Sequence, residues 1–172
     1  MKTDELARHF RAHIATKYAS NGKAPRFVLM HEVADSTGWG MTRKADAILL
    51  DCWKSKAGPQ SLHGFEFKVS RADWLTELRN PGKADAIERF CHSWTVVAAV
   101  DVVKDKDFWA SPQREQWGLC EVLPGGVVVI RQKAKPQDAD PAPMRFVASL
   151  VRRAFEAGRD EGLARVADEV GE

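Results

Sequence analysis

An aspartate inside an apolar run is the feature that most constrains how this chain can fold. Asp46 lies in the run 43–53, where its neighbours are Ala45, Ala47, Ile48, Leu49 and Leu50. An ionised carboxylate in such surroundings lowers stability unless it is hydrogen-bonded, paired with a cation or bound to a metal ion. The fold must therefore supply a partner for Asp46.

The next apolar run, residues 62–69, carries two charged side chains near its end. Strand side chains alternate between faces, so Glu66 and Lys68 point the same way while Phe67 points to the opposite face. If the two runs pair as antiparallel neighbours, Asp46 comes within reach of Glu66. Two carboxylates with nearby backbone oxygens are the hard ligands that Mg²⁺ requires. A lysine beside them can orient a water molecule or stabilise the charge that develops on a phosphate.

The hydrophobic period predicts a sequence of elements around these two runs. Ser70, with Asp73 three residues later, predicts the start of a helix. The remaining predicted elements are a helix to about residue 18, a strand at 27–33, a restart of the second helix near Asn80 that continues to about 91, a strand at 94–100, a hairpin at 118–123 and 127–131, and a helix from 144 to about 170.

The order helix-strand-strand-strand-helix-strand, with Asp in one strand and Glu-x-Lys ending the next, resembles the PD-(D/E)-x-K nuclease superfamily. Residues 43–47 and 64–75 resemble most closely the MmcB-like DNA-repair proteins and related phage and bacterial proteins. This resemblance implies a restriction-endonuclease-like α/β fold, with a mixed, mainly antiparallel sheet flanked by helices, plus a C-terminal helix. We expect a nuclease-like domain at 1–132, a proline-rich linker at 133–143 and a C-terminal helix at 144–172.

The resemblance also implies Mg²⁺-dependent or Mn²⁺-dependent hydrolysis of DNA phosphodiesters. Asp46 and Glu66 would hold the metal ion, with the backbone carbonyl of Phe67 as an extra ligand, and Lys68 would position the attacking water and stabilise the phosphate charge. A third acidic group is expected at Glu32, which ends the first strand. Glu5 on the first helix is the alternative, because other members of the superfamily use a helical glutamate.

Several further residues are candidates for DNA contacts. Ser70 and Arg71 follow Lys68 at a helix start, where free backbone N–H groups favour anions, although Ser70 also serves as a helix cap. Trp39, in a glycine-containing loop, could stack on a base or fold back onto the core. The local basic residues that we expect to contact phosphates are Arg43, Lys44, Arg71 and Lys83, although Lys83 could equally be an ordinary surface residue.

Composition limits the other interpretations. The 172 residues suit one domain, and a formal net charge of +2 gives no global basic field, so any DNA-binding surface must be local. The three cysteines lie in apolar runs and are expected to be reduced core thiols. We find no membrane span or secretory signal and expect a cytoplasmic protein. There are two alternatives to an enzyme: a DNA-binding module, and a protein-interaction subunit that keeps the fold. The protein could form a homodimer or bind a repair or replication partner.

Overall fold

The computed structural model describes residues 1–19, 25–53, 60–80, 82, 84–108 and 115–170, with residues 160–170 described as backbone only. The chain runs through α1 (Thr3–Lys17), β1 (Phe27–Ala34), a 3-10 turn η1 (Gly38–Gly40), β2 (Lys44–Asp51), β3 (Ser61–Lys68), α2 (Arg71–Arg79), α3 (Asp85–Glu88), β4 (Ser93–Ala99), α4 (Asp105–Phe108), β5 (Gly118–Val122), β6 (Val128–Gln132) and α5 (Met144–Val170).

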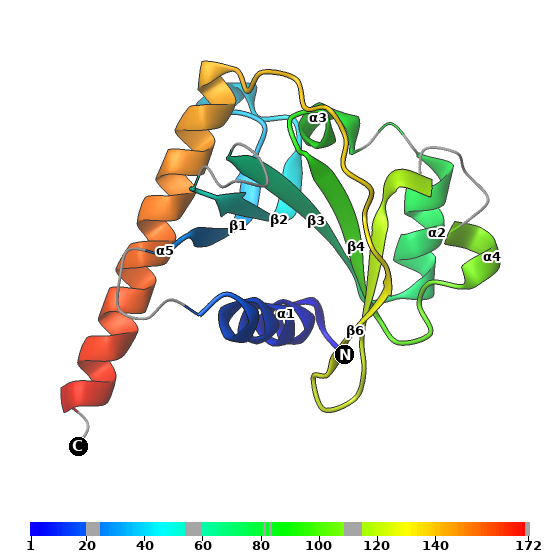
Figure 1. Ribbon diagram of the computed structural model, residues 1–172, viewed down its shortest axis with the longest axis horizontal. Coiled ribbons are helices and arrows are strands. Elements are labelled where there is room, and N and C mark those ends of the chain that lie inside the picture. The colour runs from blue at the N-terminus through cyan, green and yellow to red at the C-terminus, as the bar shows by residue number, and fades with distance from the viewer. Residues whose placement is uncertain (20–24, 54–59, 81, 83, 109–114, 171–172) are drawn as a thin grey trace.

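The strands form one six-stranded sheet in which spatial order equals chain order, from β1 to β6. β1, β2 and β3 pair antiparallel, β3, β4 and β5 pair parallel, and β6 returns antiparallel to β5. Helices flank this mixed sheet and a long helix ends the chain (Figure 1). The predicted α/β fold class is therefore confirmed, including the order helix-strand-strand-strand-helix-strand.

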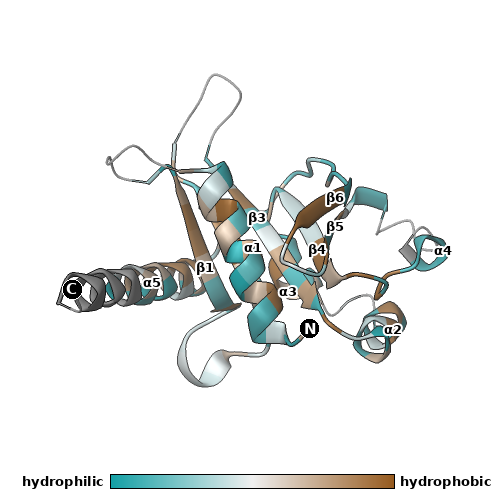
Figure 2. Cartoon of the chain, turned by 90° about the horizontal axis from the view of Figure 1, so that it is seen from below, coloured by the Kyte–Doolittle hydropathy of each residue, from teal (hydrophilic) through white to brown (hydrophobic). Residues whose placement is uncertain are grey.

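α1 covers one face of the sheet because its apolar residues recur at helical spacing. Leu6, Phe10 and Ile14, four residues apart, are buried. The ring of Phe10 lies 4.8 Å from that of Phe65 and 5.7 Å from that of Phe67, measured between centroids. Seen from below, α1 crosses in front of the sheet with hydrophobic and hydrophilic patches alternating along it (Figure 2). Phe65 and Phe67 of β3 thus face α1.

The opposite face of β3 presents Gly64, Glu66 and Lys68 to the segment that contains α2 and α3. Gly64 pairs with Trp94 of β4, and the two lie so close that a Cβ on Gly64 would fall 2.1 Å from Cε3 of the Trp94 ring. Trp94 is only 2% exposed, so its ring cannot swing away. The missing side chain at Gly64 is what allows the indole to lie flat on β3.

We expect Gly64→Ala to lower the free energy of unfolding by about 1 to 3 kcal/mol, because the added methyl group overpacks the buried indole. Gly158→Ala on α5 is a suitable control, since a Cβ there meets no atom within 4 Å and alanine favours the helix. Urea unfolding of both variants measures the difference. A Gly64→Ala midpoint equal to that of the wild type would contradict this account of the packing.

Two predicted segments differ from the structure. Of the described residues in the restarted helix, predicted from near Asn80 to about residue 91, those of α3 are α-helical. The backbone then closes in turns, where the N–H groups of Phe90 and Cys91 donate to the carbonyls of Ile87 and Glu88. The segment between β4 and β5, for which the sequence analysis gives no helix or strand, contains the short helix α4. Both differences lie in short segments, where only a few apolar positions are available and hydrophobic periodicity carries little information.

Residues 133–143, predicted to be a linker, have no regular secondary structure but are fixed to the body of the domain. The N–H groups of Lys135, Gln137 and Asp140 donate to the carbonyls of Gln116, His92 and Arg89 at 2.8, 3.0 and 2.8 Å. This strap leads to α5, whose Phe146 ring lies 5.2 Å from Phe90 and which packs along β1. The strap and α5 thus pack against the same body as the six strands (Figure 1).

Candidate metal centre

The sheet register places three acidic residues side by side on neighbouring strands. His31 and Val33 of β1 pair with Ala47 and Ala45 of β2, so Glu32 lies opposite Asp46. Ala47 pairs with Phe65 of β3, so the next position brings Asp46 opposite Glu66. The three positions lie where β2 begins and where β1 and β3 end, beside the carboxyl ends of the parallel strands β3 and β4. Ligands commonly bind at such ends in α/β sheets.

Asp46 and Glu66 are half-buried and electrostatically coupled. Oδ2 of Asp46 accepts a hydrogen bond of 2.6 Å from the backbone N–H of Phe67. Burial, with repulsion from the Asp46 carboxylate, raises the pKa of Glu66 to about 7, although Lys68 opposes this shift. A carboxyl group that resists ionisation because another carboxylate is close will favour a bound cation.

Lys68 lies between carboxylates and is almost completely buried, with 2% of its side chain exposed. Its Nζ donates to Oε1 of Glu66 at 2.9 Å and to Oε2 of Glu77 at 3.0 Å, and lies 3.7 Å from Oδ2 of Asp73. Burial alone would lower the pKa of Lys68, but attraction and hydrogen bonding to Glu66 and Glu77 raise it above the ordinary value. Lys68 therefore stays protonated and acts as a fixed positive charge rather than as a base.

Glu77 and Asp73, on α2, belong to this cluster, although the sequence analysis did not predict them as site residues. Glu77 is 3% exposed and sits one helical turn after the buried Trp74. The spacing between Trp74 and Glu77 could have predicted this position. Residues i and i+3 share a helix face, so an acid three residues after a core tryptophan is expected to face the core. The cluster holds four carboxylates and one ammonium, a net charge of −3 when all are ionised.

Glu32, predicted as the third acid, is in register with Asp46, but its carboxylate turns outward. The side chain is 69% exposed, and Oε2 lies 3.8 Å from both Lys44 Nζ and an Arg153 nitrogen. Its backbone φ is +51°, a conformation that costs a residue with a side chain roughly 1 to 2 kcal/mol. The alternative, Glu5, accepts from the backbone N–H of Lys2 at 3.3 Å and lies 3.9 Å from His9.

The residues predicted to contact DNA fall into separate groups. Ser70 caps α2, its Oγ accepting from the N–H of Asp73 at 3.2 Å. Arg71 pairs with Asp107 and donates to the carbonyl of Val102 at 3.1 Å, which holds α2 against the segment with α4. Lys83 lies outside the described residues.

The β1–β2 loop carries the remaining candidates, Trp39, Arg43 and Lys44. Trp39 is fully exposed, so the alternative in which it folds back onto the core is wrong. Asp35 fixes the loop, because its Oδ1 accepts from the N–H groups of Thr42 at 3.0 Å and Arg43 at 3.3 Å. The loop thus holds Trp39 away from the body, a few residues from Glu32 and Asp46.

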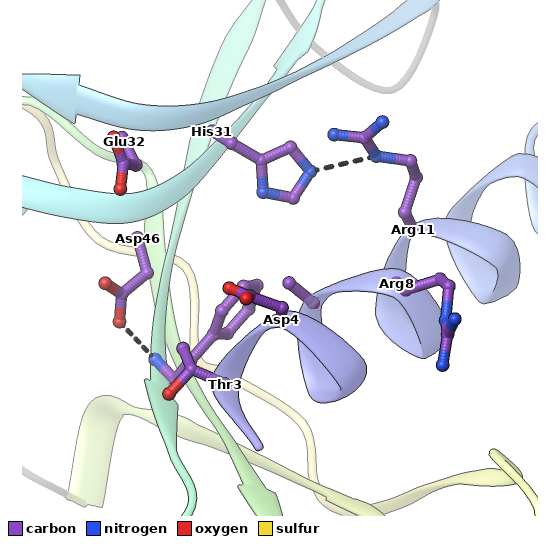
Figure 3. A pocket seen from close by; sticks show the side chains of 9 residues that line it. Thr3, Asp4, Arg8, Arg11, His31, Glu32 and Asp46 are labelled. Atoms are coloured by element: carbon purple, nitrogen blue, oxygen red, sulfur yellow. Dashed lines mark hydrogen bonds between the residues drawn. The ribbon is translucent and has the colours of Figure 1, made fainter.

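A cavity of about 410 Å³ opens beside Asp46, between α1 and the ends of the strands. His31, Glu32, Asp46 and Phe67 line it from the strands, and Asp4, Arg8 and Arg11 line it from α1 (Figure 3). Nε of Arg11 donates to Nε2 of His31 at 3.3 Å. Burial first, and then the nearby Arg11 charge, lower the pKa of His31 to about 4, so the ring is neutral at neutral pH and can accept this hydrogen bond.

The donor set suits a hard divalent cation. Asp46 and Glu66 supply two carboxylates, and Mg²⁺ is commonly held by one or two carboxylates while keeping several waters. Within the described ranges, no group of three or more acidic, histidine or cysteine side chains is arranged to hold a metal ion. Glu32 points to Lys44 and Arg153, and Lys68 holds Glu66, so the pair of Asp46 and Glu66 is the part of the cluster that fits the ion.

The raised pKa of Glu66 predicts how stability responds to pH and metal. A carboxyl group with a higher pKa in the folded than in the unfolded chain stabilises the fold at low pH, and this contribution is lost as the pH rises from about 4.5 through about 7. We therefore expect Glu66→Gln to gain stability relative to wild type over this range, by at most about 1.4 kcal/mol per pH unit. Mg²⁺ should remove the difference, since it compensates the same charge.

Glu88 is a matched control for this experiment. Burial raises its pKa to about 7 as well, and its carboxylate accepts from Nε1 of Trp117 at 2.5 Å rather than belonging to the acidic cluster. Urea unfolding between pH 5 and 8 should show the same trend for Glu88→Gln, but without a response to Mg²⁺. Equal Mg²⁺ stabilisation of wild type and Glu66→Gln at pH 8 would show that the ion does not bind here.

Comparisons with known proteins support the fold. No family model matches the chain, and no curated protein matches it. A solved structure of a protein of unknown function from Silicibacter pomeroyi is similar, with a TM-score of 0.58 and 18% sequence identity, over 100% of this chain and 96% of that one. In the part of the chain that the structure describes, every helix is too short or too polar to cross a membrane. The overall fold is thus shared with another protein over nearly the whole of both chains.

Proposed function

We propose that the protein is a Mg²⁺-dependent or Mn²⁺-dependent deoxyribonuclease that hydrolyses DNA phosphodiesters, in DNA repair, recombination or phage DNA metabolism. The observation that carries this proposal is the pair of Asp46 and Glu66 on adjacent strands, beside Lys68, which donates to Glu66 at 2.9 Å and whose pKa is raised by the carboxylates around it. A net negative cluster that also contains a fixed ammonium suits a cation and a phosphate at the same place. We place the protein in the cytosol.

The side chains divide the work between them. Asp46 and Glu66 would hold the ion, with the carbonyl of Phe67 as the predicted additional ligand. The N–H of Phe67 fixes one oxygen of Asp46, which orients the carboxylate. When bound, the divalent ion supplies activation of water and neutralisation of phosphate charge.

Lys68 would contribute charge and position. An ammonium has three donors, and two of those of Lys68 are directed at Glu66 and Glu77. The remaining donor can be directed at the attacking water or at a phosphate oxygen. Because Lys68 stays protonated, it stabilises the negative charge of the transition state and does not take up the proton of the water.

The β1–β2 loop supports DNA as the substrate. Trp39 is fully exposed on a loop held by Asp35, with Arg43 and Lys44 at its base. Bases of every type stack on aromatic side chains, and phosphates attract basic ones. The loop therefore offers DNA a contact surface next to the acidic cluster.

The test is cleavage of plasmid, single-stranded and branched DNA by purified protein with Mg²⁺, Mn²⁺, Ca²⁺ or EDTA. We expect cleavage with Mg²⁺ and Mn²⁺, and binding without cleavage with Ca²⁺, whose longer and more flexible coordination suits catalysis poorly. Absence of cleavage of every form in Mg²⁺ and Mn²⁺ would exclude the enzyme.

One observation favours a second function, a DNA-binding or interaction subunit that keeps the fold without turnover. Lys68 is 2% exposed and its charge is balanced by Glu66 and Glu77, so this part of the cluster is satisfied by its own hydrogen bonds. Such a subunit would bind DNA or a repair partner equally in EDTA and in Ca²⁺. A deoxyribonuclease of the kind proposed would bind more tightly with Ca²⁺.

A further inference from the structure

We infer that the cavity between α1 and the strand ends is a phosphate site for a single DNA strand, in which Arg11 and Arg8 contact the strand next to the bond that is cut. This inference rests on the proposed function, because it places a divalent ion at the acidic pair. Of that pair, Asp46 lines the cavity, whereas Glu66 lies on the face of β3 opposite to the lining residue Phe67. It adds a set of substrate contacts on α1 and a preference for unpaired strands over intact duplex.

The strand wall of the cavity is acidic, and the helix wall carries two arginines and one aspartate. Figure 3 shows Glu32 and Asp46 on the strand side, and Arg8, Arg11 and Asp4 on the helix side. A phosphate that bound here without a cation would be repelled by the carboxylates of Asp46 and Glu32. A cation that bound without an anion would leave Arg8 and Arg11 without an anionic ligand. A phosphodiester bridging a divalent ion and a guanidinium satisfies both walls at once.

Arg11 is already held in position for this role. Its Nε donates to His31, a contact that uses one of the five N–H donors of a guanidinium. The planar fork of the group matches phosphate oxygens in a bidentate manner. His31 acts as a positioning residue, because the neutral ring accepts from Arg11 and fixes its direction. Arg8, one turn earlier on α1, is exposed on the same cavity.

The size of the cavity selects the form of DNA. A volume of about 410 Å³ lies in the range of pockets that hold small molecules, which is about 300 to 1,000 Å³. The cavity lies between α1 and the strand ends, and a DNA strand that contacts both walls is expected to bend there. Duplex DNA is stiff, with a persistence length of about 150 base pairs, whereas an unpaired strand turns within a few nucleotides. Single strands, frayed ends and flaps are therefore the substrates that fit.

The experiment measures anisotropy of labelled oligothymidine and of a blunt hairpin duplex, in Ca²⁺ and in EDTA, for wild type and variants. Wild type should bind oligothymidine in Ca²⁺ at least about tenfold more tightly than the hairpin. Arg11→Ala should weaken oligothymidine binding by about 10-fold to 100-fold, the cost of a charge-assisted hydrogen bond, and lower the slope of log affinity against log salt by about 0.7. Arg8→Ala should act in the same direction.

Two controls separate a specific contact from a general loss of charge or structure. Arg131→Ala, on the edge strand β6 and paired with Glu121, should bind within about twofold of wild type. His31→Leu should weaken binding, and His31→Gln, which keeps an acceptor for Arg11, should restore most of it. Urea unfolding confirms that each variant is folded before its affinity is compared.

The outcomes distinguish this inference from the proposed function. If the wild type cleaves DNA with metal and Arg11→Ala binds and cleaves equally well, the inferred contacts on α1 are wrong. The proposed nuclease activity would be unaffected by that result. Duplex bound as tightly as oligothymidine would overturn the strand preference. If inorganic phosphate displaces oligothymidine when its concentration equals that of the oligonucleotide's phosphate groups, the cavity is a site for free phosphate rather than for a DNA strand. If the wild type neither binds nor cleaves DNA, both the α1 phosphate site and the proposed nuclease function are wrong.

Discussion

Asp46→Asn and Glu66→Gln should each lower metal-dependent DNA cleavage by more than about 10²-fold while leaving the fold intact. Each amide keeps the shape of the carboxylate, and asparagine can still accept from the N–H of Phe67. The negative charge that attracts a divalent ion is lost in both. Cleavage rates with Mg²⁺, together with calorimetric titration of the metal, measure the effect, and metal binding should fall with the rate.

Two residues provide matched controls for these substitutions. Asp51 ends the same strand as Asp46 and accepts two hydrogen bonds from Arg26, at 2.9 and 2.6 Å, far from the acidic cluster along β2. Glu88 has a raised pKa like that of Glu66. Asp51→Asn and Glu88→Gln should cut DNA at close to the wild-type rate. Full activity in both Asp46→Asn and Glu66→Gln would assign the cleavage to another site or to a contaminant.

Lys68→Ala should lower the free energy of unfolding by about 3 to 5 kcal/mol, because it leaves Glu66 and Glu77 buried without their cation. Its effect on the metal should be opposite to that of the acids. Removing a positive charge from beside the carboxylates should keep or raise the affinity for Mg²⁺, while the cleavage rate falls by about 10²-fold. Thermal unfolding with and without Mg²⁺, calorimetry and cleavage rates separate the three effects.

A second variant keeps this prediction testable if Lys68→Ala does not fold. Combining it with Glu77→Gln removes one of the two buried carboxylates that lose their partner, so the double variant should recover part of the stability. The slow cleavage should persist in the double variant, because the missing ammonium causes it. Loss of Mg²⁺ binding together with turnover would contradict the role proposed for Lys68.

The strands were predictable because their signals are local. Alternation of side chains along residues 62–69 placed Glu66 and Lys68 on one face, and an acid within an apolar run indicated that Asp46 needed a partner. The pairing of β2 with β3 then follows from chain order, and the register delivers Asp46 opposite Glu66. The predicted site therefore depended on one assumption beyond the sequence pattern, namely that the two runs are neighbours.

The remaining parts of the site come from tertiary contacts that no local pattern encodes. Glu77 reaches Lys68 only because α2 folds back over β3, and Arg11 meets His31 only because α1 crosses the sheet. Arg71 was predicted to contact phosphate from its place after Lys68, but its partner is Asp107, 36 positions away in the chain. The prolines of residues 133–143 excluded helix and strand, and they could not reveal that the strap would be bonded to the body.

The contact between Arg153 and Glu32 determines when, during synthesis, the backbone of Glu32 can gain its support from α5. Arg153 of α5 donates to the carbonyl of Glu32 at 3.1 Å, at the residue whose backbone is held at a positive φ. The two residues are 121 positions apart, so a nascent chain can fold its sheet before the segment that supports Glu32 has left the ribosome. The last strand, β6, ends at Gln132 and Arg153 follows 21 residues later, so at about 5 to 20 residues per second this delay lasts about 1 to 4 seconds. A truncated product released in that interval would carry Asp46 and Glu66, but the backbone of Glu32 would lack the hydrogen bond from α5 that supports its positive φ.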